Sequence, residues 1–386
     1  MSKIHRSDLL GRTFRASPSY ELVLFDRLTL RERQTLEHLR DDPGFYGVLR
    51  PREVGSRQGV KSVDRETALL FLTLREPGPL PSYLETALGE EIGRTIARLV
   101  ADGILEVEEE GAFLSGPAVF VGTGGEAGQG RLAELSLAAL RYGQELDLDD
   151  PRLLSLRLYG YNRRPLTPRW KRLLASAEAV QAHLGLASGG ASRRLLDGIW
   201  TPLRASEAWL SWRIRSGDPS SRPDGATFKL YVSPVLEALG ESFGEILAAL
   251  AVTRAPCFKI GADAAGLLRP DKIVAWFPDF ERLVGAAHAI ASRLEGVAAQ
   301  GVPFTSEIAG EGLLSWGADP PAGAGAWGTS ESWRLWLTHR LARALLDGRA
   351  AEGAEIEPWR FALERVRLEG VDPETWTPGA LLRREI

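Results

Sequence analysis

The chain has 386 residues and a net charge of −4, from 47 lysines and arginines against 51 aspartates and glutamates. This balance argues against a general nucleic-acid coat protein and against a protein that binds anionic membranes, because both depend on excess positive charge. One cysteine and five scattered histidines offer no disulfide and no metal-ligand spacing, so we expect neither a metal nor another cofactor. No apolar run is long enough for a signal peptide or a membrane span, and we expect a cytoplasmic protein.

The first 121 residues are predicted to be mostly helical. A partial leucine stripe indicates a helix over 18–41, and a Pro- and Gly-rich loop follows over 42–62. The next predicted elements are helices over 65–75 (capped by Asp64), 82–88 and 90–102, then a two-stranded ribbon formed by 104–108 and 112–114. Three helices followed by a ribbon is the order of a winged helix-turn-helix, so we interpret 1–121 as a helical, winged-helix-like module.

The predicted wing is acidic, since it contains Glu106, Glu108, Glu109 and Glu110. Carboxylates at this position would repel DNA phosphates, so DNA binding, the usual function of such modules, is disfavoured. Binding of a peptide or protein partner and a purely structural role both remain open for the module.

A glycine-rich segment over 122–130 follows the module. Ala127 stands where the third glycine of a dinucleotide-binding loop would be, which argues against that function. We interpret the segment as a linker, and residues 131–386 as a separate α+β domain.

Aromatic and basic residues interleave between 155 and 175, among them Tyr159, Tyr161 and Trp170. This pattern is compatible with a lip around a substrate site, and also with a loop that packs its rings on the core. A pair of helices is predicted beyond it, over 171–187 and 193–210.

Three short strands are predicted over 228–233, 257–261 and 269–277, because apolar and polar residues alternate there. Each carries a cation within it or at its mouth, namely Lys229, Lys259, and Arg269 with Lys272. Cations on neighbouring strands are suited to hold an anion. In the first strand, the period of two places Lys229, Tyr231 and Ser233 on one face. That row is suited to bind and protonate a substrate, although a solvated sheet face is the alternative.

Lys259 has apolar and small neighbours, Cys257-Phe258 before it and Ile260-Gly261 after it. Partial burial and nearby cations both lower the pKa of a lysine, so Lys259 is a candidate base. The alternative is an ordinary lysine held in an ion pair.

A long helix is predicted over 333–346, after a helix over 280–294, a strand over 312–320 and a loop over 322–330. Its Arg334 and Arg340 lie six residues apart, on faces about 120° apart around the helix. At least one of these arginines is therefore placed to point at the cationic sheet, unless the helix is simply solvated.

The C-terminal half carries an ordered set of short motifs. They are Lys229-Leu-Tyr231-Val-Ser233, Phe258-Lys259-Ile, Arg269-Pro-Asp271-Lys-Ile-Val-Ala-Trp-Phe, Val302-Pro-Phe-Thr305, Gly312-Leu-Leu-Ser-Trp-Gly-Ala-Asp319-Pro320, Glu331-Ser332-Trp-Arg334 and Glu369-Gly-Val-Asp372. In order and spacing, from about 209 to 378, the set resembles the HopA-type effector family, whose bacterial relatives act as phosphothreonine and phosphoserine lyases in peptide biosynthesis. The first strand is also similar to the Lys-x-His-x-Ser strand of effector phosphothreonine lyases, with Tyr231 in place of the histidine.

The resemblance implies a lyase-like α+β domain with a mixed sheet, and an activity that eliminates phosphate without a metal. By matching positions, Lys259 would abstract the α-proton, Tyr231 would take the place of the acid, and Lys229 would bind phosphate. The further cations expected around the phosphate are Arg269, Lys272, Arg334 and Arg340.

The resemblance also implies a partner, a phosphorylated and ribosomally made precursor peptide of lanthipeptide type, with a kinase as a possible second partner. The alternative is a protein without activity that binds a phosphopeptide or leader peptide for a biosynthetic kinase. Neither nucleic acid nor membrane is expected as a partner.

Overall fold

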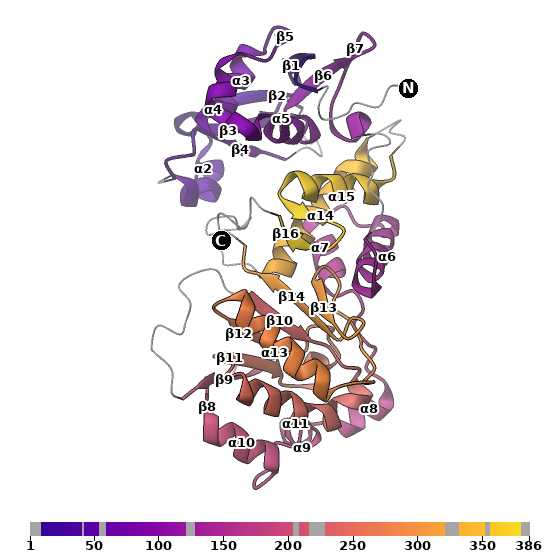
Figure 1. The fold of residues 1–386 in the computed structure, drawn as a ribbon. Helices are drawn as coiled ribbons and strands as arrows, with labels where there is room; N and C mark the ends of the chain where they lie inside the picture. Colours follow the sequence, from indigo (N-terminus) through magenta and orange to yellow (C-terminus); the bar gives the residue numbers. More distant parts are fainter. Residues whose placement is uncertain are drawn as a thin grey trace. The chain divides into compact units, whose positions relative to one another are not determined.

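The computed structural model (Figure 1) describes residues 9–40, 42–53, 59–120, 128–203, 208–215, 228–320, 332–351 and 356–379. The chain divides into two compact units. Unit 1 comprises residues 1–125 and 343–369, and unit 2 comprises residues 126–342 and 370–386. Most of the predicted linker over 122–130, and the predicted loop over 322–330, lie outside the described residues.

The described residues of unit 1 form two antiparallel sheets. The first has the order β5-β1-β6-β7, formed by Gly78–Pro79, Thr13–Ala16, Leu105–Glu109 and Ala112–Leu114. The second has the order β2-β3-β4, formed by Tyr20–Leu24, Gly47–Pro51 and Lys61–Val63. The helices are α2 (Leu30–Leu36), α3 (Arg65–Thr73), α4 (Tyr83–Leu88), α5 (Ile92–Ala101) and α15 (Pro358–Leu368), with 3-10 turns η1 (Phe25–Arg27), η2 (Glu37–Leu39), η3 (Gly89–Glu91) and η4 (Gly116–Phe120).

The predicted helix over 18–41 and loop over 42–62 are both wrong. Tyr20–Leu24 forms strand β2, which pairs with β3 from inside the expected loop, and β4 completes that sheet. The helix begins only at Leu30, after a capping box in which Thr29 and Glu32 each accept a hydrogen bond from the other's backbone N–H. Pairing with a distant strand therefore overrides the helical preference of the leucines before Thr29.

The elements after Asp64 follow the predicted order. The Asp64 side chain caps α3 by accepting a hydrogen bond from the backbone N–H of Thr67 at 2.7 Å, and α4, α5, β6 and β7 come next. Strand β1 lies between β5 and the β6–β7 ribbon. The winged-helix assignment remains a prediction, because the order of elements alone does not establish it.

Unit 2 is built on a seven-stranded sheet with the order β13-β14-β10-β12-β11-β9-β8. Its strands are Ser306–Ala309, Leu314–Ala318, Phe228–Val232, Ile273–Phe277, Cys257–Gly261, Trp209–Ile214 and Trp200–Pro202. Every pairing in this sheet is antiparallel, so the α+β class is confirmed but the expected mixed sheet is wrong. Strands β10 and β11 do run in the same direction, but β12 lies between them and runs the opposite way.

The helices of unit 2 are α6 (Arg131–Glu145), α7 (Pro151–Tyr159), α8 (Pro168–Leu173), α9 (Ala177–His183), α10 (Ala191–Ile199), α11 (Leu236–Val252), α12 (Ala264–Leu267) and α13 (Phe280–Arg293). Helix α14 (Trp333–Ala350) contributes residues to both units, and the two-residue strands β15 (Val371–Asp372) and β16 (Thr377–Pro378) pair near the C-terminus.

The predicted helix over 171–187 is divided, because the Ser176 side chain caps a new helix, α9. The predicted helix over 193–210 stops at Ile199, where buried Trp200 starts strand β8 and Pro202 cannot continue a helix. The predicted strand over 312–320 is present as β14. The long C-terminal helix also forms, as α14, and it runs on to Ala350.

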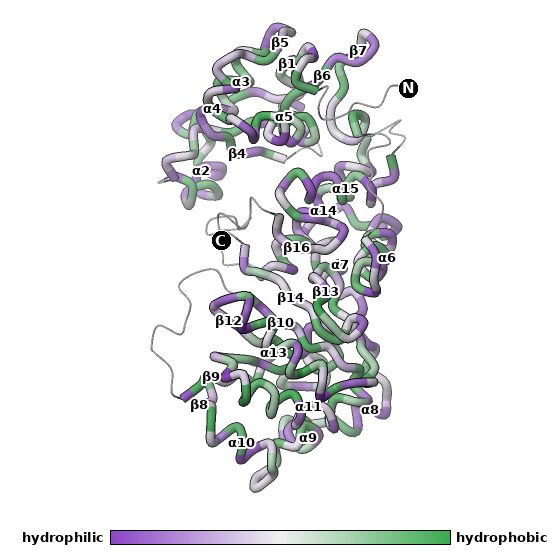
Figure 2. Tube along the Cα trace, in the orientation of Figure 1, coloured by the Kyte–Doolittle hydropathy of each residue, from purple (hydrophilic) through white to green (hydrophobic). Residues whose placement is uncertain are grey.

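One face of the seven-stranded sheet packs on helices α11 and α13 to form the main core. Leu230 and Val232 of β10 point into this core, beside Phe243 of α11 and Ile290 of α13. Tyr231 belongs instead to a separate cluster with Val274, Trp276 and Val302. The alternation predicted for β10 is therefore confirmed. Figure 2 shows hydrophobic and hydrophilic stretches mixed along the trace of this unit.

Within the described ranges, no helix combines the length and the apolar character that crossing a bilayer requires.

Candidate functional site

The strand register brings three of the predicted site residues onto one face of the sheet. Tyr231 and Lys259 both stand opposite Val274, from the two strands that flank β12. Lys229 lies two residues before Tyr231 on the same face. Two interstrand spacings, about 10 Å at the backbone, therefore separate Tyr231 from Lys259.

Lys259 lies between two indole rings. Its Nζ atom is 3.9 Å from the ring centroid of Trp209 and 5.3 Å from that of Trp276. Both tryptophans occupy neighbouring positions on the same face, since Trp209 stands opposite Gly261 and Trp276 opposite Cys257. Burial, helped by the charges of Lys229 and Arg269, lowers the pKa of Lys259 to about 8, although Asp271 opposes this change. At pH 7 roughly one molecule in ten then carries the neutral amine.

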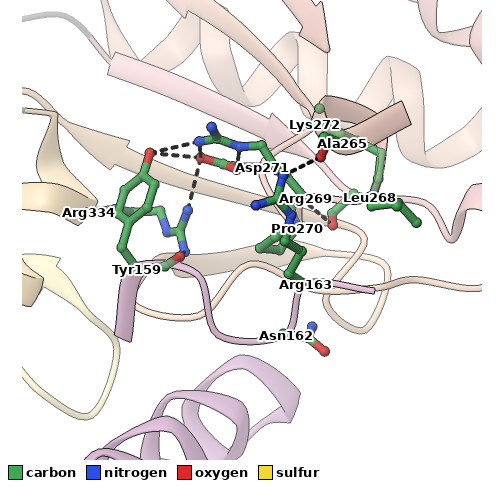
Figure 3. Close-up of polar contacts among 12 residues, drawn as sticks. Tyr159, Asn162, Arg163, Ala265, Leu268, Arg269, Pro270, Asp271, Lys272 and Arg334 are labelled. Atoms are coloured by element: carbon green, nitrogen blue, oxygen red, sulfur yellow. Dashed lines mark hydrogen bonds and ion pairs between the residues drawn. The ribbon is translucent and has the colours of Figure 1, made fainter. Parts of the chain in front are cut away.

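A buried carboxylate, Asp271, lies at the centre of a polar network shown in Figure 3. Arg269 donates to both of its oxygens, from Nε to Oδ1 at 2.8 Å and from Nη2 to Oδ2 at 2.9 Å. The Tyr159 hydroxyl donates to Oδ2 at 3.0 Å, and Arg334 Nη1 forms an ion pair with the same oxygen at 3.0 Å. Burial alone would raise the pKa of Asp271, but Arg334 and Arg269 hold it well below its usual range.

Tyr159 connects the two arginines of this network. Its hydroxyl accepts a hydrogen bond from Arg269 Nη2 at 3.1 Å, and its backbone carbonyl accepts one from Arg334 Nη2 at 2.8 Å. The Arg334 guanidinium also lies 4.4 Å from the centroid of the Tyr159 ring and donates from Nε to the Pro303 carbonyl at 3.0 Å. Arg334 is only 1% exposed, so this network fixes its position.

Lys229 and Tyr231 occupy the β10 side of the face. The Lys229 amine is paired with the carboxylate of Asp319, which follows β14. Tyr231 is buried, and this burial raises the pKa of its phenol well above the ordinary value, partly opposed by Arg334. The phenol is therefore neutral at physiological pH and able to donate a proton or a hydrogen bond.

Two of the residues predicted to bind phosphate, Lys272 and Arg340, have other contacts than the residues around Asp271. Lys272 is fully buried, and its Nζ donates to the Pro234 carbonyl at 2.9 Å and to Gln300 Oε1 at 2.7 Å, while burial lowers its pKa to about 7. Arg340 packs its guanidinium 3.8 Å from the centroid of the Trp336 ring on its own helix. We therefore leave both residues outside the proposed phosphate contacts.

The structure thus brings together Lys229, Tyr231, Lys259, Arg269 and Arg334. The sequence predicted no catalytic or phosphate-binding role for Tyr159 or Asp271, although Tyr159 belongs to the segment interpreted as a substrate lip or a packing loop. Asp271 belongs to the motif Arg269-Pro-Asp271, two residues after Arg269. This short separation from a candidate cation was the signal from which an ion pair could have been predicted.

No family model matches the chain, and no curated protein matches it. Among solved structures, the effector protein from Pseudomonas syringae pv. tomato strain DC3000 is similar at a TM-score of 0.37 and 9% identity, over 62% of this chain and 96% of that chain. The effector protein from Pseudomonas syringae pv. syringae strain 61 gives a TM-score of 0.34 and 11% identity, over 64% and 98%. Both are weak likenesses of fold, too weak to support any conclusion about the site.

Proposed function

We propose that the protein is a lyase that eliminates phosphate from phosphoserine or phosphothreonine in a ribosomally made peptide. The observation that carries the proposal is a largely buried lysine, Lys259, with a pKa of about 8, on the same sheet face as a second amine and a neutral phenol. The order of motifs in the C-terminal half supports the same activity.

The proposed reaction needs a base, an acid and cations. The neutral Nζ of Lys259 takes the α-proton, the C–H electrons form the Cα–Cβ double bond, and the bond from Cβ to the phosphate oxygen breaks. Tyr231 gives its proton to the departing oxygen and recovers one from solvent. The products are a dehydroamino acid and inorganic phosphate, and Lys259 releases its proton to water.

Charge in the site is suited to a phosphate dianion. Four cations, contributed by Lys229, Lys259, Arg269 and Arg334, surround two carboxylates, Asp271 and Asp319. Two positive charges therefore remain while Lys259 is protonated, and one remains when Lys259 carries the neutral amine that acts as the base, so the site stays positive toward a phosphate dianion in both states. Guanidinium and ammonium groups bind phosphate oxygens through charge-assisted hydrogen bonds.

One observation favours a second candidate, a protein that binds a phosphopeptide without acting on it. Lys229 is already paired with Asp319, and both arginines are paired with Asp271. A phosphate must exchange with these carboxylates or add to them, and such an arrangement also suits a binding site that performs no chemistry.

Incubation with a library of short peptides, each carrying one phosphoserine or phosphothreonine, tests both candidates. We expect mass spectrometry to show loss of phosphoric acid from some peptides, with an equal release of inorganic phosphate. Saturable binding without any mass change would establish the second candidate instead. If no peptide shows either binding or a mass change, both candidates are excluded.

Trp209→Ala is expected to move the pH dependence of elimination upward. Because Lys259 acts in its neutral form, the rate should rise about tenfold per pH unit below pH 8 and level off above it. Removing the ring admits water and returns the pKa toward its ordinary 10.5. The lost cation–π contact acts in the opposite direction but is worth only about 0.5–1 kcal/mol, less than one pKa unit. An unchanged profile would contradict the proposed role of burial.

Tyr231→Phe is expected to lower kcat by about a hundredfold or more, because the leaving oxygen then lacks its acid. The phenyl ring still fills the buried position, so the fold should persist. Tyr142→Phe, at a half-exposed tyrosine of α6, is the matched control and should leave kcat unchanged. A Tyr231→Phe protein as active as the wild type would remove Tyr231 from the mechanism.

A further inference from the structure

A continuous basic segment runs through unit 2 from α7, along the connection at 160–167, into α8 (Figure 1). Residues 151–176 contain seven lysines and arginines and no aspartate or glutamate, in a chain whose net charge is −4. All seven are exposed: Arg152, Arg157, Arg163, Arg164, Arg169, Lys171 and Arg172. We call this segment the basic strip.

The backbone of the basic strip is held firmly against the rest of unit 2. Asn162 donates from Nδ2 to the carbonyls of Gln300 at 2.8 Å and Gly301 at 2.9 Å, and the Gln300 amide donates back to the Asn162 carbonyl at 2.7 Å. Asn162 has a positive φ of 65°, a conformation that asparagine tolerates better than most residues. The Arg164 N–H donates to the Leu268 carbonyl at 3.0 Å. The strip is therefore ordered before any ligand arrives.

The basic strip contacts the candidate site through Tyr159. Tyr159, the last residue of α7, contributes its hydroxyl to the Asp271 network, and Figure 3 shows Arg163 next to the same network. Arg164 lies close enough to lower the pKa of buried Lys272. A peptide whose phosphorylated residue occupies the site thus has Arg163 and Arg164 of the strip within a few residues' reach.

The three arginines of the strip nearest to Tyr159 along the chain make no ion pair with a carboxylate of the described residues. None of the ion pairs in the described part of the chain uses Arg157, Arg163 or Arg164, and the guanidinium of Arg163 donates to a backbone carbonyl, that of Ala265, at 2.7 Å. Leu156 and Leu166 lie among them, 57% and 49% exposed. Cations interspersed with exposed apolar side chains suit a partner that carries carboxylates and some apolar residues.

We propose that the basic strip binds an acidic stretch of the substrate peptide, next to the phosphorylated residue. This inference rests on the proposed function, because it is the position of the strip beside the candidate phosphate site that selects a phosphopeptide as the ligand. Recognition by exposed charges adds affinity and orientation rather than chemistry.

The test compares two synthetic phosphothreonine peptides, one with Asp, Glu and Leu around the phosphothreonine and one with Asn, Gln and Leu. Exposed charge pairs are each worth two- to threefold in affinity, so three arginines predict about tenfold tighter binding of the acidic peptide in ~0.1 M salt. Added salt should shrink this difference. The dissociation constants and the release of phosphate are measured together.

The variant combines Arg157→Gln, Arg163→Gln and Arg164→Gln, and should bind both peptides equally. Its control combines Arg194→Gln, Arg282→Gln and Arg293→Gln, three exposed arginines of unit 2 outside the strip, and should keep the preference. The two proteins have the same net charge, so a general electrostatic effect would change them alike.

Equal binding of the two peptides by the wild type would overturn the inference, as would an equal loss of preference in the control. Capture of the wild type, but not of the strip variant, by vesicles of anionic phospholipid, without any preference between peptides, would assign the strip to membranes instead. The two proposals fail separately. A preference for the acidic peptide without phosphate release refutes the lyase alone, and phosphate release without that preference refutes the basic strip alone.

Discussion

Lys259→Ala should reduce the elimination of phosphate about a thousandfold while leaving the protein folded. General bases contribute roughly 10²- to 10⁴-fold to enzymatic rates, and the lowered pKa of Lys259 suits it to take a proton near neutral pH. The side chain is held between Trp209 and Trp276 and makes no ion pair with the residues that the structure describes, so its loss should not unfold the protein. Loss of phosphoric acid from a phosphopeptide, followed by mass spectrometry under single-turnover conditions, measures the effect.

Lys259→Arg separates the role of base from the role of cation. A guanidinium keeps the positive charge and stacks well on indole rings, but it does not deprotonate in proteins. We therefore expect this variant to bind phosphopeptides about as well as the wild type and to be as inactive as Lys259→Ala. Substantial activity in the arginine variant would show that position 259 contributes charge only, and the proton would then need another acceptor.

Two further measurements test whether the loss of activity in Lys259→Ala is caused by the loss of a base. Arg194→Ala, at an exposed arginine of α10 outside the basic strip, should retain full activity in the same assay. Small primary amines such as methylamine should restore part of the activity of Lys259→Ala, because the substitution leaves space between the indole rings. Restored activity that depends on the concentration of neutral amine identifies the missing group as a base.

The parts of the fold that local pattern determines were predictable. The three cationic strands and the inward-facing residues of β10 follow from a period of two, which a few residues suffice to define. The direction and order of the strands were not predictable in this way. Strand β12 lies between β10 and β11 because of pairings between segments that are far apart in the chain. The local alternation of apolar and polar residues gives no information about such pairings.

The same limit explains the incorrect helix over 18–41. Leucines at 22 and 24 suit a helix and a half-buried strand about equally well, and the outcome depends on whether a partner strand exists elsewhere. The partner, β3, lies in a segment whose glycines and prolines indicated a loop. Its strand character appears only once it is paired with Tyr20–Leu24.

The candidate site was predictable in its cations but not in how they are balanced. Lys259 stands among apolar neighbours in the sequence, so its burial was expected. The hydroxyl of Tyr159 meets Asp271 across 112 positions of the chain, and Lys272 meets Gln300 across 28. A single sequence shows which side chains carry charge but gives no indication of which distant polar group will pair with them.

Asp271→Asn should destabilise unit 2 by about 3–5 kcal/mol, the usual cost of removing one partner from a buried ion pair. The amide preserves the shape of the side chain but leaves two guanidiniums together, and that of Arg334 is only 1% exposed. Asp279→Asn is the control, because Asp279 caps α13 at an exposed position where asparagine caps equally well. Urea unfolding followed by tryptophan fluorescence should show the loss in the first variant only.

The direction of the pKa shift of Asp271 determines how its contribution to stability depends on pH. Because the folded-state pKa of Asp271 is depressed, the stability that its ionised form contributes is fully present above the unfolded value of about 3.9. That contribution declines as the pH falls below this value toward the folded pKa. The difference in unfolding free energy between the wild type and Asp271→Asn should therefore be largest near neutral pH and shrink in acid. A difference that stays constant down to pH 3 would mean that packing, not charge, accounts for the loss.

Asp271→Asn should also make the candidate base more available at neutral pH, even though it makes the protein less stable. Asp271 raises the pKa of Lys259, against the larger influence of burial, so removing its charge should lower that pKa below about 8. The neutral fraction of Lys259 at pH 7 then increases, and the pH profile of any remaining elimination moves to lower pH. We therefore expect a less stable protein whose elimination activity has a pH profile shifted to lower pH. Both effects arise because one carboxylate pairs with the arginines and also holds the proton on Lys259. A profile that does not move would show that Asp271 is too well screened to influence Lys259, and its role would then be confined to the arginines.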